Sequence, residues 1–185
     1  MLTNAEREIL VQHLETTAQH FRDSVAGLTG AQWTFTPGGA AWSIAGIAEH
    51  LIITEANVLR RVQTTLLESP PSPEEWRAKA PHKDRMLLER VATDRTVKAQ
   101  APEASHPAGR MATPAEALAA FENARGRTLE YAAGTLDDLR GHYSTHAALK
   151  ELDGYQWLLL MGSHTARHVA QIAEVKSAPG YPDHA

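Results

Sequence analysis

Four helix-start signals, each followed by a run with helical periodicity, constrain the fold of this chain more than any other feature. Each signal is a Ser, Thr or Asp that can cap a first turn, and three of them precede a Glu or Gln by three residues, as a capping box requires. The signals are Thr3 with Glu6, Ser43, Thr113 with Pro114 and Glu116, and Asp153 with Gln156. They predict four long helices, at about residues 3–28, 43–67, 113–133 and 153–176.

The segments between these helices predict how the helices connect. The first two helices, and likewise the last two, are joined by short connections, so each pair is expected to be antiparallel. The prolines of "ESPPSPEEW" end the second helix, and "DRMLLERVATDRTVKAQ" predicts a shorter helix at about 84–98 within the long middle connection, residues 68–112. No run alternates as a strand does. We therefore predict an all-α single domain over residues 1–185. It is expected to be an up-down-down-up four-helix bundle with a long crossover between helices 2 and 3.

Composition excludes several classes of function. The formal net charge is −4, so the chain offers no basic field for a polyanion and we expect no nucleic-acid partner. The chain has no cysteine, which excludes disulfides, thiolate nucleophiles and cysteine-based zinc sites and is typical of a cytoplasmic protein. No apolar run approaches the ~18 residues of a membrane span. The N-terminus has no secretory pattern, so we expect neither membrane insertion nor export.

The last predicted helix carries two histidines, His164 and His168, on its apolar side. Successive residues of a helix turn by ~100°, so positions four apart share a face. The same arc contains Trp157, Leu160, Met161, Gln171, Ile172 and Val175. That arc is expected to face the core, which would bury both imidazoles.

Two imidazoles in apolar surroundings need partners, because an unsatisfied buried polar group costs ~1–3 kcal/mol. A divalent cation would satisfy both, since it takes neutral ring nitrogens as ligands. The alternative is that each ring is hydrogen-bonded in the core or at its rim. HxxxH spacing arises easily by chance in a chain with ten histidines.

A third candidate ligand, His50, lies on the second predicted helix at the border of its apolar stripe. Thr54, Asn57 and Arg61 follow on the same flank, so the edge of the stripe is polar. We infer a pocket there with His50 at its deepest point and the polar flank as its wall. Three neutral histidines would leave metal positions open, as in a reactive site. The alternative is a solvated shoulder of the helix.

Other patterns narrow the chemistry. A zincin has a glutamate after its first histidine, whereas "HTARH" has Thr165 there. The Glu-x-x-His pairs of two-iron bundles and a glycine-rich phosphate loop are absent from the sequence. His142 and His146 repeat the HxxxH spacing within a connection and either overhang the pocket or lie apart from it.

The chain resembles the DinB-like superfamily, also called DinB/YfiT-like. The resemblance consists of "AAWSIAGIAEHL" with its histidine, the long middle connection, and the closing "GYQWLLLMGSHTARHVAQIAEVKSAPGYP". It implies an up-down-down-up bundle that is often dimeric, and a divalent metal, commonly zinc or nickel, on His50, His164 and His168. The superfamily includes bacillithiol S-transferases and mycothiol-dependent isomerases, and many members called metal-dependent hydrolases without a demonstrated substrate.

These observations lead to three hypotheses. The first is a metal-dependent enzyme, a thiol-dependent transferase or hydrolase, which acts on a small molecule, has a low-molecular-weight thiol as a partner and forms a homodimer. Arg61, Asn57 or a residue of the 134–152 connection would hold the substrate's charged end, and Gln171 would lie beside the metal. The second is a non-catalytic metal-binding stress or sensor protein. The third is a metal-free helical interaction module.

Overall fold

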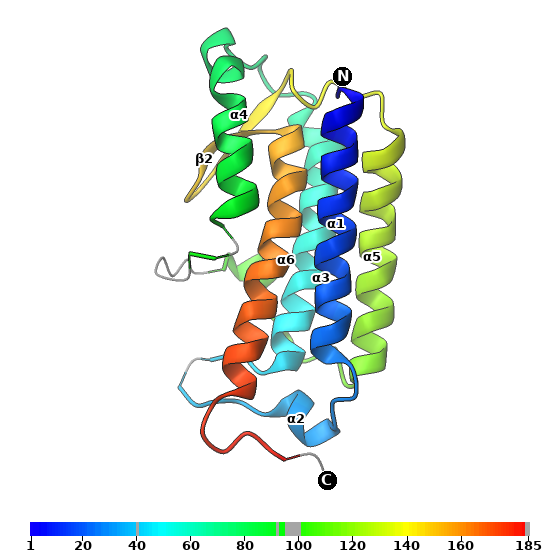
Figure 1. Ribbon diagram of the computed structural model, residues 1–185, viewed down its shortest axis with the longest axis vertical. Coiled ribbons are helices and arrows are strands. Elements are labelled where there is room, and N and C mark those ends of the chain that lie inside the picture. Colours follow the sequence, from blue (N-terminus) through cyan, green and yellow to red (C-terminus); the bar gives the residue numbers. More distant parts are fainter. Residues whose placement is uncertain (40, 92, 95–100, 184–185) are drawn as a thin grey trace.

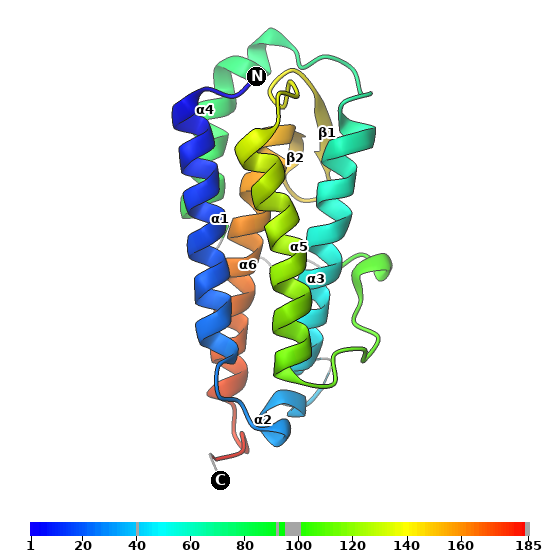
Figure 2. The same ribbon diagram turned by 90° about the vertical axis from the view of Figure 1, so that its right-hand side faces the viewer.

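Four long helices lie side by side and form the body of the molecule (Figures 1 and 2). The computed structural model describes residues 1–39, 41–91, 93–94 and 101–183. The long helices are α1 (Asn4–Val25), α3 (Ile44–Arg61), α5 (Pro114–Gly134) and α6 (Gly154–Lys176). Both α1 and α3 pack against α5 and α6, so α1 and α3 occupy opposite corners of the bundle.

Shorter elements connect the long helices. The helix α2 (Gly30–Thr34) closes one end, and a π-helical turn, η1 (Val62–Leu66), extends α3. The middle connection contains α4 (Glu74–Glu89), which packs on α6, and a 3-10 turn, η2 (Glu103–Ser105). Strands β1 (Tyr143–His146) and β2 (Lys150–Asp153) form an antiparallel hairpin between α5 and α6.

The predicted helix starts agree with the structure. The capping boxes of Thr3 with Glu6, Thr113 with Glu116, and Asp153 with Gln156 are all formed. The hydroxyl of Ser43 accepts a hydrogen bond from the Gly46 backbone amide. A side chain at each start therefore satisfies backbone donors that the helix itself leaves free.

Two predictions are corrected. The helix expected at 84–98 is α4 at Glu74–Glu89, which begins after Pro73 with two acidic residues in its first turn and includes Pro81. Residues 92 and 95–98 of the predicted range lie outside the described residues. The hairpin was not expected, because strands of four residues are too short to show a clear alternation.

Two apolar clusters fill the bundle, with a buried polar layer beside them. One cluster includes Leu14, Leu158 and Leu159, and the other includes Trp33 and Phe121. The polar layer centres on Arg125, which is 1% exposed. No helix among the described residues is long and apolar enough to cross a membrane.

Candidate metal centre

His50 is fixed by a carbonyl from the middle connection. It lies buried on α3, and its Nδ1 atom is 2.7 Å from the backbone oxygen of Ser105. A carbonyl oxygen only accepts, so Nδ1 carries the proton and Nε2 presents its lone pair. The ring of Trp42 packs 4.9 Å away, centroid to centroid, and helps to fix the imidazole plane.

The two histidines of α6 lie one turn apart with their rings 4.4 Å apart, centroid to centroid. Nδ1 of His168 is 2.7 Å from Oε1 of Gln171, and this amide oxygen likewise accepts the ring proton. Nε2 of His168 is thereby left with its lone pair. Partners of this kind, which hold the far nitrogen of an imidazole, are typical of metal-binding histidines.

The three Nε2 atoms converge. Nε2 of His164 lies 3.3 Å from Nε2 of His50 and 3.1 Å from Nε2 of His168. One ligand atom from each of the three residues falls within 4.8 Å of the others. Nitrogens bound tetrahedrally at ~2.1 Å from one zinc ion would be about 3.4 Å apart. The donor set thus fits one small divalent cation.

The surroundings of His50 and His164 favour the neutral form of both imidazoles. Burial lowers the pKa of His50 below its usual value. Burial, followed by the neighbouring His168 and His50 rings, lowers the pKa of His164 well below its usual value. A neutral imidazole has a free lone pair, and this is the state that a metal requires.

The segment that contains the Ser105 carbonyl is held in place by Glu49, the residue before His50. The carboxylate of Glu49 accepts hydrogen bonds from the backbone amides of Gly109 and Arg110, and from Nε of Arg110 at 2.7 Å. Burial alone would raise the pKa of Glu49, but these hydrogen bonds outweigh it and hold the pKa below its usual range. The segment around Ser105 is thus tied to α3.

A buried ion pair next to the triad joins α3 and α5, and its arginine also donates hydrogen bonds to α6 and α1. Nε and Nη2 of Arg125 on α5 donate to the two carboxylate oxygens of Glu55 on α3, at 2.6 and 3.0 Å. Nη2 also donates to the hydroxyl of Thr165, the neighbour of His164 on α6, at 2.9 Å. This pair could not be predicted from the sequence, because nothing in the local pattern links residues 55 and 125. It ties together the helices that carry the triad.

The residues predicted to surround the triad have different positions. Gln171 contacts His168 as described above. Oγ1 of Thr54 is buried without a hydrogen-bond partner among the described residues. Oδ1 of Asn57 accepts a hydrogen bond from Nη2 of the exposed Arg60 at 2.7 Å. Arg61 lies over the ring of Trp157, 5.0 Å from its centroid.

The two histidines of the hairpin region are separated by the structure. Nδ1 of His142 lies 2.8 Å from the backbone oxygen of Ser69, on the side of the middle connection. The ring of His146 lies 5.4 Å from that of Trp157, centroid to centroid. Of these two histidines, His146 is the one whose ring packs against α6, at Trp157, two turns before His164.

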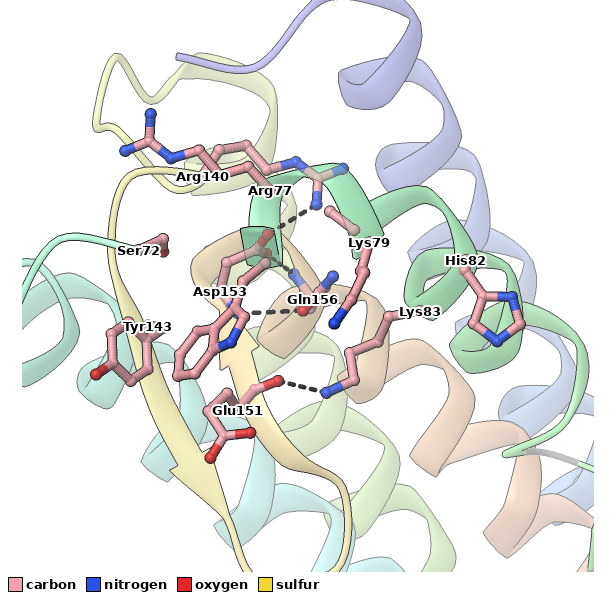
Figure 3. Close-up of a pocket in the computed structure, with 12 residues that line it drawn as sticks. Ser72, Arg77, Lys79, His82, Lys83, Arg140, Tyr143, Glu151, Asp153 and Gln156 are labelled. Carbon is pink, nitrogen blue, oxygen red and sulfur yellow. Dashed lines mark hydrogen bonds and ion pairs between the residues drawn. The ribbon is translucent and has the colours of Figure 1, made fainter. Parts of the chain in front are cut away.

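A hollow of about 330 Å³ lies between α4 and the hairpin (Figure 3). Three of its charged side chains are held by structural contacts. Nζ of Lys83 donates to the backbone oxygens of Leu149 and Glu151, and Arg140 donates to Asp153. The triad therefore remains the stronger candidate for chemistry.

Comparison with known proteins gives the family and the fold of this chain. A family model described as the DinB superfamily matches residues 13–172. A solved structure described as "YfiT from Bacillus subtilis is a probable metal-dependent hydrolase with an unusual four-helix bundle topology" is similar, with a TM-score of 0.57 and 16% identity. The similarity covers 98% of this chain and 92% of that one. At this identity the structural match shows the fold alone. No curated protein matches the chain.

Proposed function

Because this chain belongs to the DinB superfamily, we propose that it is a metal-dependent enzyme whose divalent ion is held by His50, His164 and His168. The observation that carries the proposal is the convergence of three Nε2 atoms, two of which have their lone pairs exposed by partners on Nδ1. When bound, such an ion lowers the pKa of a thiol or of water toward neutral pH. Zinc and nickel are the metals that we propose.

The chain's own acids favour a thiol over water as the nucleophile. The two carboxylates near the triad on α3 form ion pairs, Glu49 with Arg110 and Glu55 with Arg125. Neither is free to act as a general base. Because a thiol needs less help from a base than water does, we propose thiol-dependent transfer to a small molecule, with hydrolysis as the second reaction. The relative described as a probable hydrolase is the reason to retain hydrolysis.

The second candidate is a metal-binding protein without catalysis. A closed, inert site would need a fourth protein ligand. Within the described ranges, the group of potential ligands contains His50, His164 and His168 and no fourth His, Asp or Glu. An open position for substrate therefore favours the enzyme.

We also propose an up-down-down-up order for the bundle, within a single domain. The colour gradients of the four long helices support it, since α1 and α6 run downward and α3 and α5 run upward (Figures 1 and 2). The long connection that contains α4 would then be the crossover. On the family resemblance we propose a homodimer. The lack of cysteine is compatible with work in the cytoplasm.

Elemental analysis tests the metal site. One divalent ion per chain is expected, with sharp loss in His164→Ala and His168→Ala and no loss in the control His20→Ala, which alters an exposed histidine of α1. The metal-loaded protein is then assayed with thiol–electrophile pairs and with esters. Equal metal content in all variants would refute the site. A loaded protein that turns over none of these substrates would favour the non-catalytic alternative.

A further inference from the structure

Several buried polar atoms near the triad have no hydrogen-bond partner within the part of the chain that the structure describes. They include the hydroxyls of Thr54 and Ser144 and the indole Nε1–H of Trp157. In native proteins such groups nearly always bond to protein or to ordered water. Two of these groups lie on α3 and α6, the helices that carry the triad, and the third lies on β1 of the hairpin before α6. One ligand could therefore satisfy them together.

Two contacts define the positions of these groups relative to the triad. His50 meets His164 with their Nε2 atoms 3.3 Å apart, and Arg61 lies 5.0 Å from the centroid of the Trp157 ring. Helices α3 and α6 therefore run antiparallel between these two contacts. A rise of ~1.5 Å per residue places Trp157 about 10 Å along α6 from His164, and Thr54 about 6 Å along α3 from His50 on the same face.

The hairpin packs against α6 at Trp157, the end of the antiparallel α3–α6 contact that lies away from the triad. Ser144 pairs with Leu152, which is fully buried. Side chains alternate along a strand, so Ser144 and His146 lie on one face of β1. The His146 ring packs 5.4 Å from that of Trp157, which shows that this face is turned toward α6.

The groups that meet here are donors. The Trp157 indole and the Arg61 guanidinium can only donate. Nδ1 of His146 accepts hydrogen bonds from the backbone amides of Ala148 and Leu149, at 3.2 and 3.1 Å, so the proton of the neutral ring is on Nε2. The two hydroxyls can donate as well. A ligand group that only accepts would complete the set.

The charge of Arg61 also lacks a partner. Three other arginines are paired with acids: Arg110 with Glu49, Arg125 with Glu55, and Arg140 with Asp84. In the described ranges no carboxylate forms an ion pair with Arg61, whose guanidinium instead rests on the Trp157 ring. The missing acceptor should therefore carry a negative charge.

We propose that Thr54, Arg61, Ser144, His146 and Trp157, here called the donor cluster, bind the carboxylate of a small organic acid whose other end reaches the triad. A carboxylate accepts only, and it suits the fork of a guanidinium. The separation of about 10 Å along the helix axis suits an acid of modest chain length. The triad end of this inference rests on the proposed function, whereas the carboxylate end does not need the metal.

Matched ligands test the inference. Zinc-loaded protein is titrated calorimetrically with mercaptohexanoate and with mercaptohexanol, which differ only in the carboxylate. The acid should bind at least about tenfold more tightly, as expected for charge-assisted hydrogen bonds. Arg61→Gln, Trp157→Phe and Thr54→Val should each reduce this preference. The controls Arg60→Gln and Trp76→Phe, which make the same changes outside the donor cluster, should retain it.

A metal-independent measurement separates this inference from the metal proposal. Hexanoate is added to chelator-treated protein, and the indole N–H signal of Trp157 is followed by NMR, assigned with Trp157→Phe. A downfield shift supports the carboxylate site even where no metal binds. If the signal does not move and the acid binds no better than the alcohol, water satisfies the donors and the inference is overturned, whatever the metal content. Because Arg61 is exposed, Arg61→Gln should fold and keeps the test decisive.

Discussion

Replacing Arg125 by Met should destabilise the bundle by about 3–5 kcal/mol, because the change leaves a buried carboxylate without its partner. Arg125 and Glu55 are 1% and 3% exposed, and two hydrogen bonds of 2.6 and 3.0 Å join them. Water cannot replace the lost guanidinium at such burial. At about 2–4 °C per kcal/mol for a chain of this size, the melting temperature should fall by about 6–20 °C.

A double-mutant cycle measures the interaction between Arg125 and Glu55 separately from the other contacts of each residue. Glu55→Leu alone should cost a similar amount, because it leaves the Arg125 guanidinium buried and unpaired. The double variant Arg125→Met/Glu55→Leu removes both charges and fills the layer with apolar atoms. It should cost far less than the sum of the two single changes.

The assay is denaturant unfolding followed by circular dichroism. Arg22→Met provides the surface control, because Arg22 and Glu122 form an ion pair with both side chains more than a third exposed, and such pairs contribute at most about 1 kcal/mol. The reasoning would be refuted if Arg125→Met cost no more than Arg22→Met, or if the double variant were as unstable as the two single costs added together.

Three further predictions concern the packing, the titration and the metal. Gly162→Ala would place a methyl group against the His13 ring and should lower the free energy of unfolding by about 1–3 kcal/mol. The control Gly126→Ala meets no atom within 4 Å and should raise the free energy of unfolding by up to about 1 kcal/mol. Denaturant unfolding measures both changes. Chelator-treated protein should lose stability as the pH falls below 6.5, because the pKa of His164 is well below that value in the folded state and the unfolded chain takes up the proton first; a flatter profile is expected for His164→Gln, and an equal slope would contradict this. Gln171→Leu should weaken metal binding by about 10–100-fold in a chelator competition, since the change removes the amide oxygen that accepts the ring proton of His168 and orients its imidazole.

The sequence was sufficient for features that depend on neighbours along the chain. The capping residues Thr3, Thr113 and Asp153 defined helix starts because a cap and its helix are adjacent. The spacing of His164 and His168 placed both rings on one face of α6. His50 joined them only through the resemblance and the polarity of its flank, and the structure brings its Nε2 to 3.3 Å from that of His164.

Features that depend on distant residues could not be predicted from the sequence. The pairing of Glu55 with Arg125 and the contact of His50 with the Ser105 carbonyl each join segments more than fifty residues apart. The Ser105 contact uses a backbone atom, which every residue type offers equally. Helix α4 was placed too late because the prolines near its start were interpreted as a break, whereas Pro73 lies directly before its first turn.

The hairpin and the triad differ in what holds them in place. The strands β1 and β2 pair within eleven residues of chain, and the amides of its own turn fix His146. The three imidazoles of the triad depend instead on two helices and, for His50, on the Ser105 carbonyl of the distant middle connection. A substitution at the hairpin should therefore disturb the three imidazoles little, so the side chains that the hairpin presents can change while the arrangement of the three rings persists.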